Sequence, residues 1–383
     1  MEYRQLGKTG KQVSVIGLGC EFLDRKPYIS VKETIDKALE SKVNIFDVFM
    51  PGTEVREFIG KALGYRRKDI MIQGHIGATD VNKQYDISRD LPTVKRYFEE
   101  LLRVFGYIDF GMMFFIDSEQ DYKDVFETPF ASYVQQLKKN GDIHHIGFSS
   151  HNPETAMKAI QTGLPEMVMF SVNPAFDMLP SETYVFEPYE KGFDIELFRG
   201  LDPRRAELYK LCTQKQVGIT VMKAFCGGKL LSAEHSPYAK AMTIPQCIQY
   251  ALDRPAVSSV LPGCQSIEEM GRVMEYFNAS PEEKDYMSIL SGIRNDFKGN
   301  CVYCGHCQPC PVNIDVATVM KYLDIARLDK ENIPPSIRSH YQGMAGLGEA
   351  CIECGHCQGR CPFGVSVIEN MKEAALLLGT EVL

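Results

Sequence analysis

The chain has 383 residues, of which 44% are hydrophobic and 24% charged, and its formal net charge is −8. That length predicts one large domain plus a small one, and an acidic balance disfavours nucleic acid and acidic lipid surfaces as partners. Met1–Arg4 lacks the basic-then-apolar pattern of a secretory signal, and no apolar run is long enough to span a bilayer. We therefore expect a cytoplasmic protein without a membrane span.

The first three hundred residues alternate short apolar or β-branched runs with amphipathic stretches, which predicts strands alternating with helices. The predicted strands are Val13–Cys20, Asn44–Phe49, Ile70–Ile76, Phe110–Asp117, Ile143–His151, Met167–Pro174, Ile219–Phe225 and Ser258–Cys264. The predicted helices are Val31–Glu40, Val55–Leu63, Leu91–Val104, Phe130–Lys139, Glu154–Thr162, Arg204–Gln214, Pro245–Asp253 and Ile267–Phe277. The long aromatic segment Ala175–Pro203 is expected to cover a site, to dock the C-terminal module or to meet a second subunit.

Eight strands, each followed by a helix, is the pattern of a (β/α)8 TIM barrel, whose active site lies at the C-terminal ends of the strands. A doubly wound open sheet needs fewer strands and more often carries a Gly-rich fingerprint after the first one. Gly17–Cys20 lacks the third glycine of that fingerprint. We expect an α/β fold with a barrel over residues 1–285 and a ferredoxin-like domain over residues 286–383.

Two groups of four cysteines follow residue 300, one a copy of the other offset by fifty residues. A C-x2-C-x2-C run followed by a fourth cysteine and a proline is the bacterial ferredoxin pattern, whereas structural zinc usually uses two separated pairs. The spacing therefore predicts two [4Fe–4S] clusters. The candidate ligands are Cys301, Cys304, Cys307 and Cys310 in the first group, and Cys351, Cys354, Cys357 and Cys361 in the second.

The two groups differ at their last cysteine. Cys310 follows two intervening residues, whereas Cys361 follows three. In two-cluster ferredoxins the fourth cysteine ligates the other cluster, and the residues leave open whether Cys310 does so. Helices are predicted after each group, at Ile314–Ala326 and Val365–Leu377, with a Pro-rich linker at Lys330–Ser339.

Motifs along the first domain resemble those of aldo-keto reductases. They are Tyr3–Gly10, Gly17–Gly19, Phe46–Asp47, Ile59–Leu63, Tyr107–Asp109, Ile146–Ser149, Asn173 and Pro262–Gly263. With the cysteine-rich tail, the chain resembles the bacterial branch of that family with a fused C-terminal 2[4Fe–4S] ferredoxin-like domain; Val221–Lys223 and Gly227–Gly228 are typical of that branch. The resemblance implies an oxidoreductase with a small-molecule substrate, and NADP(H) or NAD(H) as a further cofactor.

Carbonyl reduction in this family uses an Asp, a Tyr, a Lys and a His, with the Tyr hydroxyl as proton donor. The Asp is retained as Asp47, but the Tyr position is Gly52, the Lys position His75 and the His position Phe114. The resemblance therefore implies that the standard Tyr-dependent reduction is not retained.

The positions that hold nicotinamide in the family are also changed. The carboxamide partners correspond to Ser149, Ser150 and Met169, and a terminal Asn corresponds to Val273. Backbone amides around the strand 7 and strand 8 loops still suit a phosphate. The candidate cofactor-binding residues are Ser149, Ser150, Asn173, Gly227, Gly228 and Gly263.

Titratable residues follow several predicted strands at the expected mouth. Glu21 follows the first, Asp47 the second, His75 the third and His151 the fifth, and these four are the catalytic candidates. An Asp47–His75 pair suits general acid/base chemistry, with a packing salt bridge as the alternative.

Three functions are compatible with these residues. In the first, the barrel binds an organic substrate and electrons pass through the clusters, with an electron-transfer protein as partner; clusters of this kind indicate an anaerobic host. Because a hydride carries two electrons and a cluster one, a direct relay needs a flavin or radical intermediate. The second is a non-redox acid/base enzyme that uses His75 and Asp47 and has structural clusters. The third is a non-catalytic electron-transfer subunit.

Overall fold

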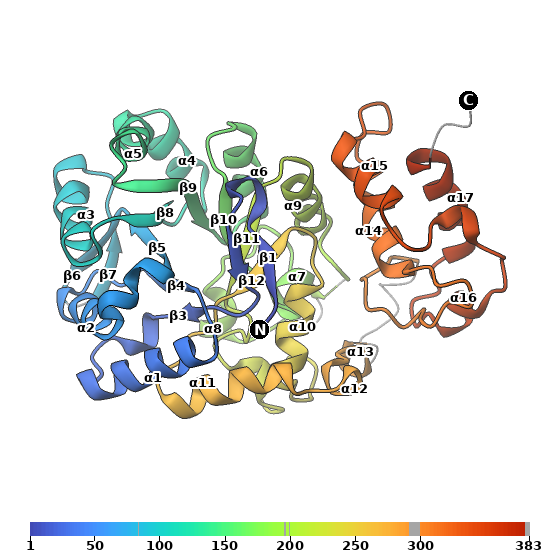
Figure 1. Ribbon diagram of the computed structural model, residues 1–383, viewed down its shortest axis with the longest axis horizontal. Coiled ribbons are helices and arrows are strands. Elements are labelled where there is room, and N and C mark those ends of the chain that lie inside the picture. Colours follow the sequence, from blue (N-terminus) through green and yellow to red (C-terminus); the bar gives the residue numbers. More distant parts are fainter. Residues whose placement is uncertain (83, 195–196, 199, 291–298, 380–383) are drawn as a thin grey trace.

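The barrel is the main feature of the computed structural model, which describes residues 1–82, 84–194, 197–198, 200–290 and 299–379 (Figure 1). Eight parallel strands pair in one sheet: β3 (Leu18–Gly19), β4 (Ile45–Val48), β5 (Met71–Ile76), β8 (Ile108–Met113), β9 (Ile143–Ser150), β10 (Met167–Ser171), β11 (Gly218–Met222) and β12 (Val257–Val260). Parallel bridges from Ile16 to Val260 and from Gly19 to Gly263 join the first and last strands. The predicted (β/α)8 fold is confirmed.

A ring of helices surrounds the strands, as predicted. It consists of α1 (Tyr28–Glu40), α2 (Thr53–Leu63), α3 (Leu91–Phe105), α5 (Pro129–Asn140), α6 (Pro153–Gln161), α9 (Pro203–Gln214), α10 (Ile244–Leu252) and α11 (Ile267–Met274). The α3 sequence shows why such a segment is helical: the Asp90 carboxylate caps its first turn, and Val94, Phe98, Leu101 and Phe105 form one buried stripe.

An N-terminal hairpin of β1 (Tyr3–Gln5) and β2 (Gln12–Ser14) covers the end of the barrel opposite the mouth. Leu6 and Val13 from this hairpin join a fully buried cluster with side chains from the strands. The other members of that cluster are Ile45, Phe110, Met112, Met167 and Met169 on the strands and Leu261 directly after β12. The barrel interior below the mouth is therefore a packed apolar core.

Several elements of the barrel were not predicted from the sequence. A hairpin of β6 (Ala78–Val81) and β7 (Gln84–Ile87) follows β5, and α4 (Glu119–Phe126) precedes α5. The β7 side chains are mostly exposed, so β7 lacks the apolar pattern by which the other strands were recognised. The segment expected to be a loop at 175–203 holds most of α7 (Pro174–Met178) and all of α8 (Glu187–Lys191).

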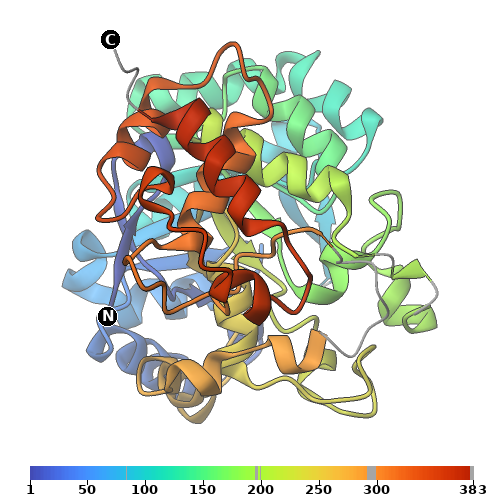
Figure 2. The ribbon, with the colours of Figure 1, turned by 90° about the vertical axis from the view of Figure 1, so that its right-hand side faces the viewer.

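The C-terminal segment packs beside the barrel, where α14 (Val316–Ala326) contacts α9 (Figures 1 and 2). The helix predicted after each cysteine group is present, as α14 and as α17 (Val367–Leu378), and the two pack against each other. The linker prediction was partly wrong, because α15 (Pro335–Gln342) begins inside it. The remaining short helices are α12 (Pro281–Lys284), α13 (Met287–Leu290) and α16 (His356–Arg360), with 3-10 turns at Gly7–Thr9, Glu21–Leu23, Gly64–Asp69, Lys229–Leu231, Glu275–Phe277 and Gly348–Ala350.

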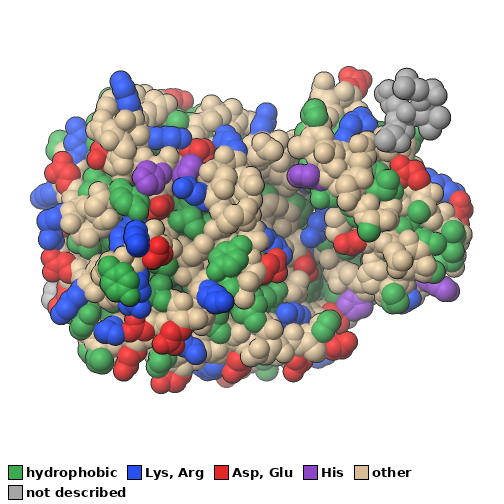
Figure 3. Space-filling view, in the orientation of Figure 1, with side chains coloured by type: hydrophobic (Ala, Val, Ile, Leu, Met, Phe, Trp, Pro, Cys, Tyr) green, Lys and Arg blue, Asp and Glu red, His purple; other side chains and the backbone are tan. Residues whose placement is uncertain are grey.

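The surface carries both signs of charge interspersed on the face shown in Figure 3. No helix in the described ranges is both long and apolar enough to cross a membrane. The predicted division between residues 285 and 286 falls between α12 and α13 and stays a prediction.

Candidate active site

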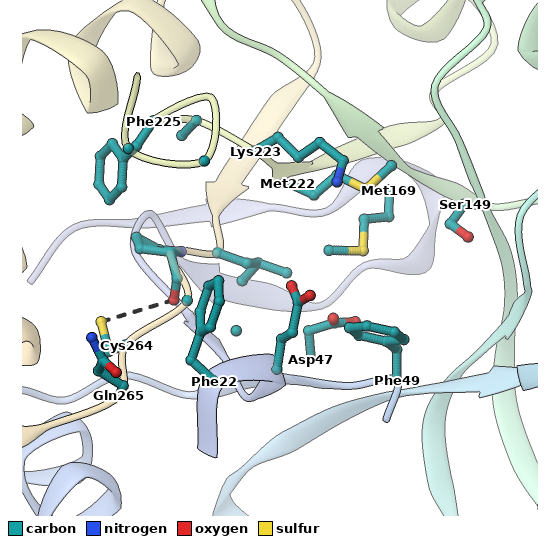
Figure 4. A pocket seen from close by; sticks show the side chains of 18 of the residues that line it. Phe22, Asp47, Phe49, Ser149, Met169, Met222, Lys223, Phe225, Cys264 and Gln265 are labelled. Carbon is teal, nitrogen blue, oxygen red and sulfur yellow. Dashed lines mark hydrogen bonds between the residues drawn. The ribbon is translucent and has the colours of Figure 1, made fainter. Parts of the chain in front are cut away.

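A cavity of about 620 Å³ opens at the C-terminal ends of the barrel strands (Figure 4). This volume is in the range of sites that bind small molecules and cofactors. Its wall contains residues at or just beyond the C-terminal ends of six of the strands, namely Gly19, Asp47, His75, Ser149, Met222 and Gly263. All four catalytic candidates from the sequence, Glu21, Asp47, His75 and His151, line it.

The first group of polar side chains in the cavity is centred on Asp47. Its Oδ1 lies 2.8 Å from His75 Nε2 and accepts a hydrogen bond of 3.0 Å from Gln73 Nε2. All three side chains are buried. Asp47 lies near the end of β4, and Gln73 and His75, two residues apart on β5, share the face that points inward. His75 Nδ1 has no hydrogen-bond partner among the described residues. The imidazole therefore has one nitrogen beside a carboxylate and one that is buried without a hydrogen-bond partner.

Aromatic rings form the wall around His75. The Phe114 ring meets His75 edge-on with centroids 5.3 Å apart, and Phe49 lies 6.0 Å from the same imidazole. Tyr85 from β7 packs on Phe49 at 5.4 Å. Burial raises the pKa of Tyr85, and the nearby Glu21 acts in the same direction. This end of the cavity suits a flat or apolar group.

Glu21 and Lys223 form the second polar group. Burial raises the pKa of the Glu21 carboxyl, while Lys223 opposes the shift. Burial lowers the pKa of the Lys223 ammonium, while Glu21 opposes that shift. In Figure 4 the Lys223 side chain extends toward Met169, and its Nζ lies 5.3 Å from the centre of the Phe186 ring. A Glu pKa that burial raises and a Lys pKa that burial lowers suit general acid/base chemistry, and the cation also suits an anionic ligand.

The sequence indicated Lys223 only as part of a family motif, and it was not predicted as a site residue. The available signal was a lysine directly after a predicted strand, at the functional end of a barrel. Its backbone is left-handed, with φ +58°, a conformation that a non-glycine residue adopts at a cost.

His151 and Asp117 form the third polar group, beyond the end of β9. His151 Nδ1 lies 2.7 Å from Asp117 Oδ2, and its backbone N–H donates to Asp117 Oδ1 at 2.6 Å. Burial lowers the pKa of His151 against the opposing charge of Asp117. Burial acts to raise the pKa of Asp117, but the charge and hydrogen bonds of His151 outweigh it and lower that pKa. Asp117 therefore orients the imidazole at the cavity wall.

The cofactor candidates divide into those that reach the cavity and those that do not. Ser149 lines it, and its Oγ accepts a hydrogen bond of 2.9 Å from Phe115 N–H. Ser150, next along the strand, is outside the lining and donates its hydroxyl to Ile116 O at 2.7 Å. Asn173 is also outside the lining; it caps α7 and donates from Nδ2 to Lys223 O at 2.8 Å.

The three glycine candidates, Gly227, Gly228 and Gly263, all line the cavity. A Cβ added at Gly263 would stand 2.5 Å from the Phe22 ring, and one at Gly227 would stand 2.6 Å from the Tyr189 ring. At Gly228 an added Cβ would meet nothing within 4 Å, so that backbone borders open space. These glycines let the chain come close to whatever fills the cavity.

The far end of the cavity is formed by the loop after β12 and by α11. Gln265, Glu269, Arg272 and Val273 line it, and Arg272 Nη2 lies 3.7 Å from Glu269 Oε1. Arg272 was not predicted as a site residue, because it lies away from the end of any predicted strand. The segment at 175–203 also contributes, because Phe186 and Tyr189 line the cavity.

The cysteine groups of the C-terminal segment surround two small cavities, each lined by four cysteines. One is lined by Cys301, Cys304, Cys307 and Cys361, and the other by Cys310, Cys351, Cys354 and Cys357. Each cavity thus takes three cysteines from one group and the last cysteine of the other. Among the residues that the structure describes, no group of three or more His, Cys, Asp or Glu side chains is arranged to hold a single metal ion.

The barrel and its cavity define the class of protein. Residues 15–246 match the Aldo/keto reductase family, and the chain belongs to that family of oxidoreductases.

Among curated proteins, the chain is 24% identical over 327 residues to the uncharacterized oxidoreductase YqkF of Bacillus subtilis strain 168, over 77% of this chain and 98% of YqkF. Among solved structures it is similar to the aldo-keto reductase AKR11C1 from Bacillus halodurans in its holo form. The TM-score is 0.58 at 20% identity, over 77% of this chain and 97% of that one. The putative aldo-keto reductase PA4992 from Pseudomonas aeruginosa has a TM-score of 0.54 at 17% identity, over 72% and 95% of the two chains.

Proposed function

We propose that this protein is an iron–sulfur oxidoreductase of the aldo/keto reductase type. Its barrel binds an organic small molecule, and the protein exchanges electrons through two [4Fe–4S] clusters held by residues 286–383. The observation that carries the proposal is the pair of cavities lined by four cysteines each. A cubane takes one thiolate per iron, and in two-cluster ferredoxins the fourth cysteine of each run ligates the other cluster. We accordingly assign Cys361 to the first cluster and Cys310 to the second.

The donor set fits clusters better than zinc. A structural zinc ion needs four donors converging at about 2.1–2.3 Å on one point. A cubane presents four separate irons, so its thiolates stand apart around a common centre. Eight thiols also need a reducing compartment to stay unpaired, which supports a cytoplasmic location.

We propose NADP(H) or NAD(H) as the ligand of the barrel cavity, where it would supply a hydride. Ser149 would hold the nicotinamide end, and the backbone at Gly227, Gly228 and Gly263 would face the phosphates. Arg272 at the far end suits a further phosphate. The open space beside Gly228 supports this fit. Met169 and Val273 provide apolar contact where the family uses amide side chains, so we expect weaker binding than a full set would give.

The residues that move protons must differ from the family's tyrosine. Glu21 and Lys223 are the candidates we assign, because both line the cavity and burial raises the pKa of the carboxyl and lowers that of the ammonium. Because a nicotinamide delivers two electrons and a cluster one, we assign the clusters to exchange with a one-electron partner protein.

Anaerobic purification followed by iron and sulfide assays tests the clusters. We expect about eight irons and eight sulfides per chain, with the spectroscopic signals of [4Fe–4S] centres. Cys361→Ala should alter the cluster of the first group, and Cys310→Ala that of the second. Zinc in place of iron would contradict the proposal. Titration with NADPH and NADH tests the barrel, and the absence of binding at millimolar concentration would exclude the nicotinamide.

A second function is supported by the buried Asp47–His75 pair in the cavity wall. A buried imidazole with one nitrogen bound to Asp47 is arranged for acid/base chemistry without electron transfer. In that case His75→Ala abolishes turnover while replacement of the cluster cysteines leaves the rate per folded molecule unchanged. If His75→Ala keeps turnover and replacement of the cluster cysteines abolishes it, the result supports the redox function.

A further inference from the structure

Arg254, in the turn between α10 and β12, is a buried cation that reaches from the barrel into the first cysteine loop. Arg254 is 2% exposed. Its Nη2 donates to Val302 O at 2.6 Å and to the Tyr286 hydroxyl at 3.3 Å. The guanidinium lies 4.4 Å from the centre of the Tyr250 ring. Within the described part of the chain, Arg254 Nε has no hydrogen-bond partner.

The contact with Val302 acts on a cysteine sulfur through one peptide group. The carbonyl of the Val302–Tyr303 peptide accepts the Arg254 hydrogen bond, and the N–H of that same peptide donates to Cys301 Sγ at 3.4 Å. Hydrogen bonds in series polarise one another, so the cation strengthens the N–H···S bond. Hydrogen bonds to sulfur, net charge and solvent exposure set the potentials of iron–sulfur clusters.

The repeat supplies an internal comparison. The matching residues of the second loop are Ile352 and Glu353, and both are exposed, Ile352 by 60%. Val302 and Tyr303 in the first loop are 3% and 8% exposed. Cys354 is also exposed, whereas the matching Cys304 is half-buried. The first loop therefore faces protein and a buried cation, and the second faces solvent.

Among the other charges near the first loop, the exposed Arg360 of the second loop donates to Cys307 O at 2.7 Å and to Pro309 O at 2.6 Å, and the carboxylates have partners of their own. Asp253 accepts from the Tyr286 hydroxyl at 2.8 Å, and Asp285 lies 3.1 Å from His306 Nε2. Asp324 accepts from the Tyr303 hydroxyl at 2.7 Å and pairs with Arg327. Lys321 is a second cation on this side, with Nζ 5.7 Å from the centre of the Tyr303 ring. Arg254 is the most deeply buried of these charges, and a low dielectric strengthens its field.

We propose that Arg254 makes the two clusters unequal. It raises the reduction potential of the cluster held by Cys301, Cys304, Cys307 and Cys361. An electron that enters at the exposed second cluster is therefore transferred to this first cluster, which lies next to the barrel. The inference rests on the proposed function. Reduction adds one negative charge to a cluster, and a buried cation stabilises that charge. In the transfer the second cluster is oxidised by one electron and the first reduced by one, with no bond or proton exchanged. The initial donor is a one-electron reductant, such as a reduced iron–sulfur or flavin protein.

The test is a redox titration of the anaerobic full-length protein with dithionite, followed by electron paramagnetic resonance. Two midpoint potentials are expected in the wild type. Arg254→Gln should lower the higher one and leave the other in place, and Arg254→Lys should cause a smaller shift. Cys354→Ser should move the lower one, which assigns it to the second cluster. Glu353→Gln is the matched control beside the second loop and should leave the higher potential unchanged.

The outcomes separate the inference from its premise. A single shared midpoint in the wild type, or a higher potential that Arg254→Gln does not lower, overturns the inference while the clusters remain. An equal shift of both potentials also overturns it, because it indicates a general loosening of the segment. If Arg254→Gln fails to fold, the Arg254→Lys shift decides. Wild-type protein without iron overturns the proposed function, and the inference falls with it.

Discussion

The Tyr250 hydroxyl donates a hydrogen bond of 2.8 Å to Asp177 Oδ2, and this contact links the mouth of the barrel to the side where the first cysteine loop packs. On the mouth side, Arg205 lies 3.2 Å from Asp177 and donates to His151 O at 3.4 Å. On the other side, the Tyr250 ring lies 5.1 Å from that of Tyr286. A buried carboxylate thus stands between the cavity and the contact region of Arg254.

Asp177→Asn should be strongly destabilising. Asp177 is fully buried and accepts from Tyr209, Tyr250 and Arg205, so the change leaves the Arg205 guanidinium buried without its counter-charge. We expect a loss of about 3–5 kcal/mol in the free energy of unfolding, measured by urea denaturation. Tyr250→Phe removes one hydrogen bond and should cost only about 1 kcal/mol. Equal losses in the two variants would contradict the role of Asp177 as the charge partner.

Gly17→Ala should destabilise the barrel at its seam. A Cβ at Gly17 would stand 2.1 Å from Leu261 Cδ2 and 2.7 Å from Ile45 O, and a backbone oxygen does not move aside easily. We expect a loss of about 1–3 kcal/mol in the free energy of unfolding. Gly271→Ala is the control, because a Cβ there meets nothing within 4 Å and lies in α11, where alanine should add about 0.5–1 kcal/mol. A neutral Gly17→Ala would argue against the close contact between first and last strands.

Lys223→Met should weaken the binding of NADPH by roughly tenfold, or about 1.4 kcal/mol, because the cavity loses a cation. The sequence has no tryptophan, so Phe22→Trp, at a cavity position that is 51% exposed, provides a single fluorescence reporter of binding. Lys139→Met, on an exposed position of α5, should leave the affinity unchanged. Unaltered affinity in Lys223→Met would show that the ammonium does not meet the nucleotide.

The pH dependence of NADPH binding offers a second measurement on Glu21 and Lys223. Lys223 opposes the rise in the pKa of Glu21, so its removal should raise that pKa further. Protonation of Glu21 should then begin at higher pH, and the binding profile of Lys223→Met should shift toward higher pH. Adding Glu21→Gln should abolish the difference; a shift that persists there would assign the titration to another group.

Glu166→Gln should destabilise the protein at neutral pH but not in acid. Burial acts to raise the pKa of Glu166, but hydrogen bonds from His145, Lys138 and the Ile146 backbone lower it from 4.5 to about 2. A carboxyl with a lowered folded-state pKa stabilises the protein above its unfolded pKa, and this contribution is lost as pH falls toward the folded value. The difference in unfolding midpoint between the wild type and Glu166→Gln should therefore narrow from pH 4.5 to about pH 2. Glu99→Gln, at an exposed position, should show no such trend.

Periodicity in the sequence was sufficient to predict the barrel. The predicted segments overlap all eight strands and their helices, because each strand buries an apolar run and each helix buries one stripe of its surface. The predicted strand Val13–Cys20 was wrong as a single strand, since it divides between β2 of the hairpin and β3 of the barrel. The hairpin that carries Tyr85 was not predicted, because β7 has no buried face and therefore shows no alternation of apolar and polar residues. The mouth could be located, since parallel strands end together, but Ser149 and Ser150 show the limit. Adjacent residues on a strand point to opposite faces, and register decides which one meets the cavity.

The sequence by itself predicted the barrel and the eight candidate cluster ligands, because these depend on local spacing and on periodicity, and its motifs carried the resemblance to the family. Only the tertiary structure decided which cysteines share a cavity, since Cys310 and Cys361 each lie with the other group. It also decided that Arg254 meets Val302, 48 residues away along the chain. Contacts of this kind depend on how packed elements meet in space, and the spacing of residues along a short stretch of chain does not predict these meetings.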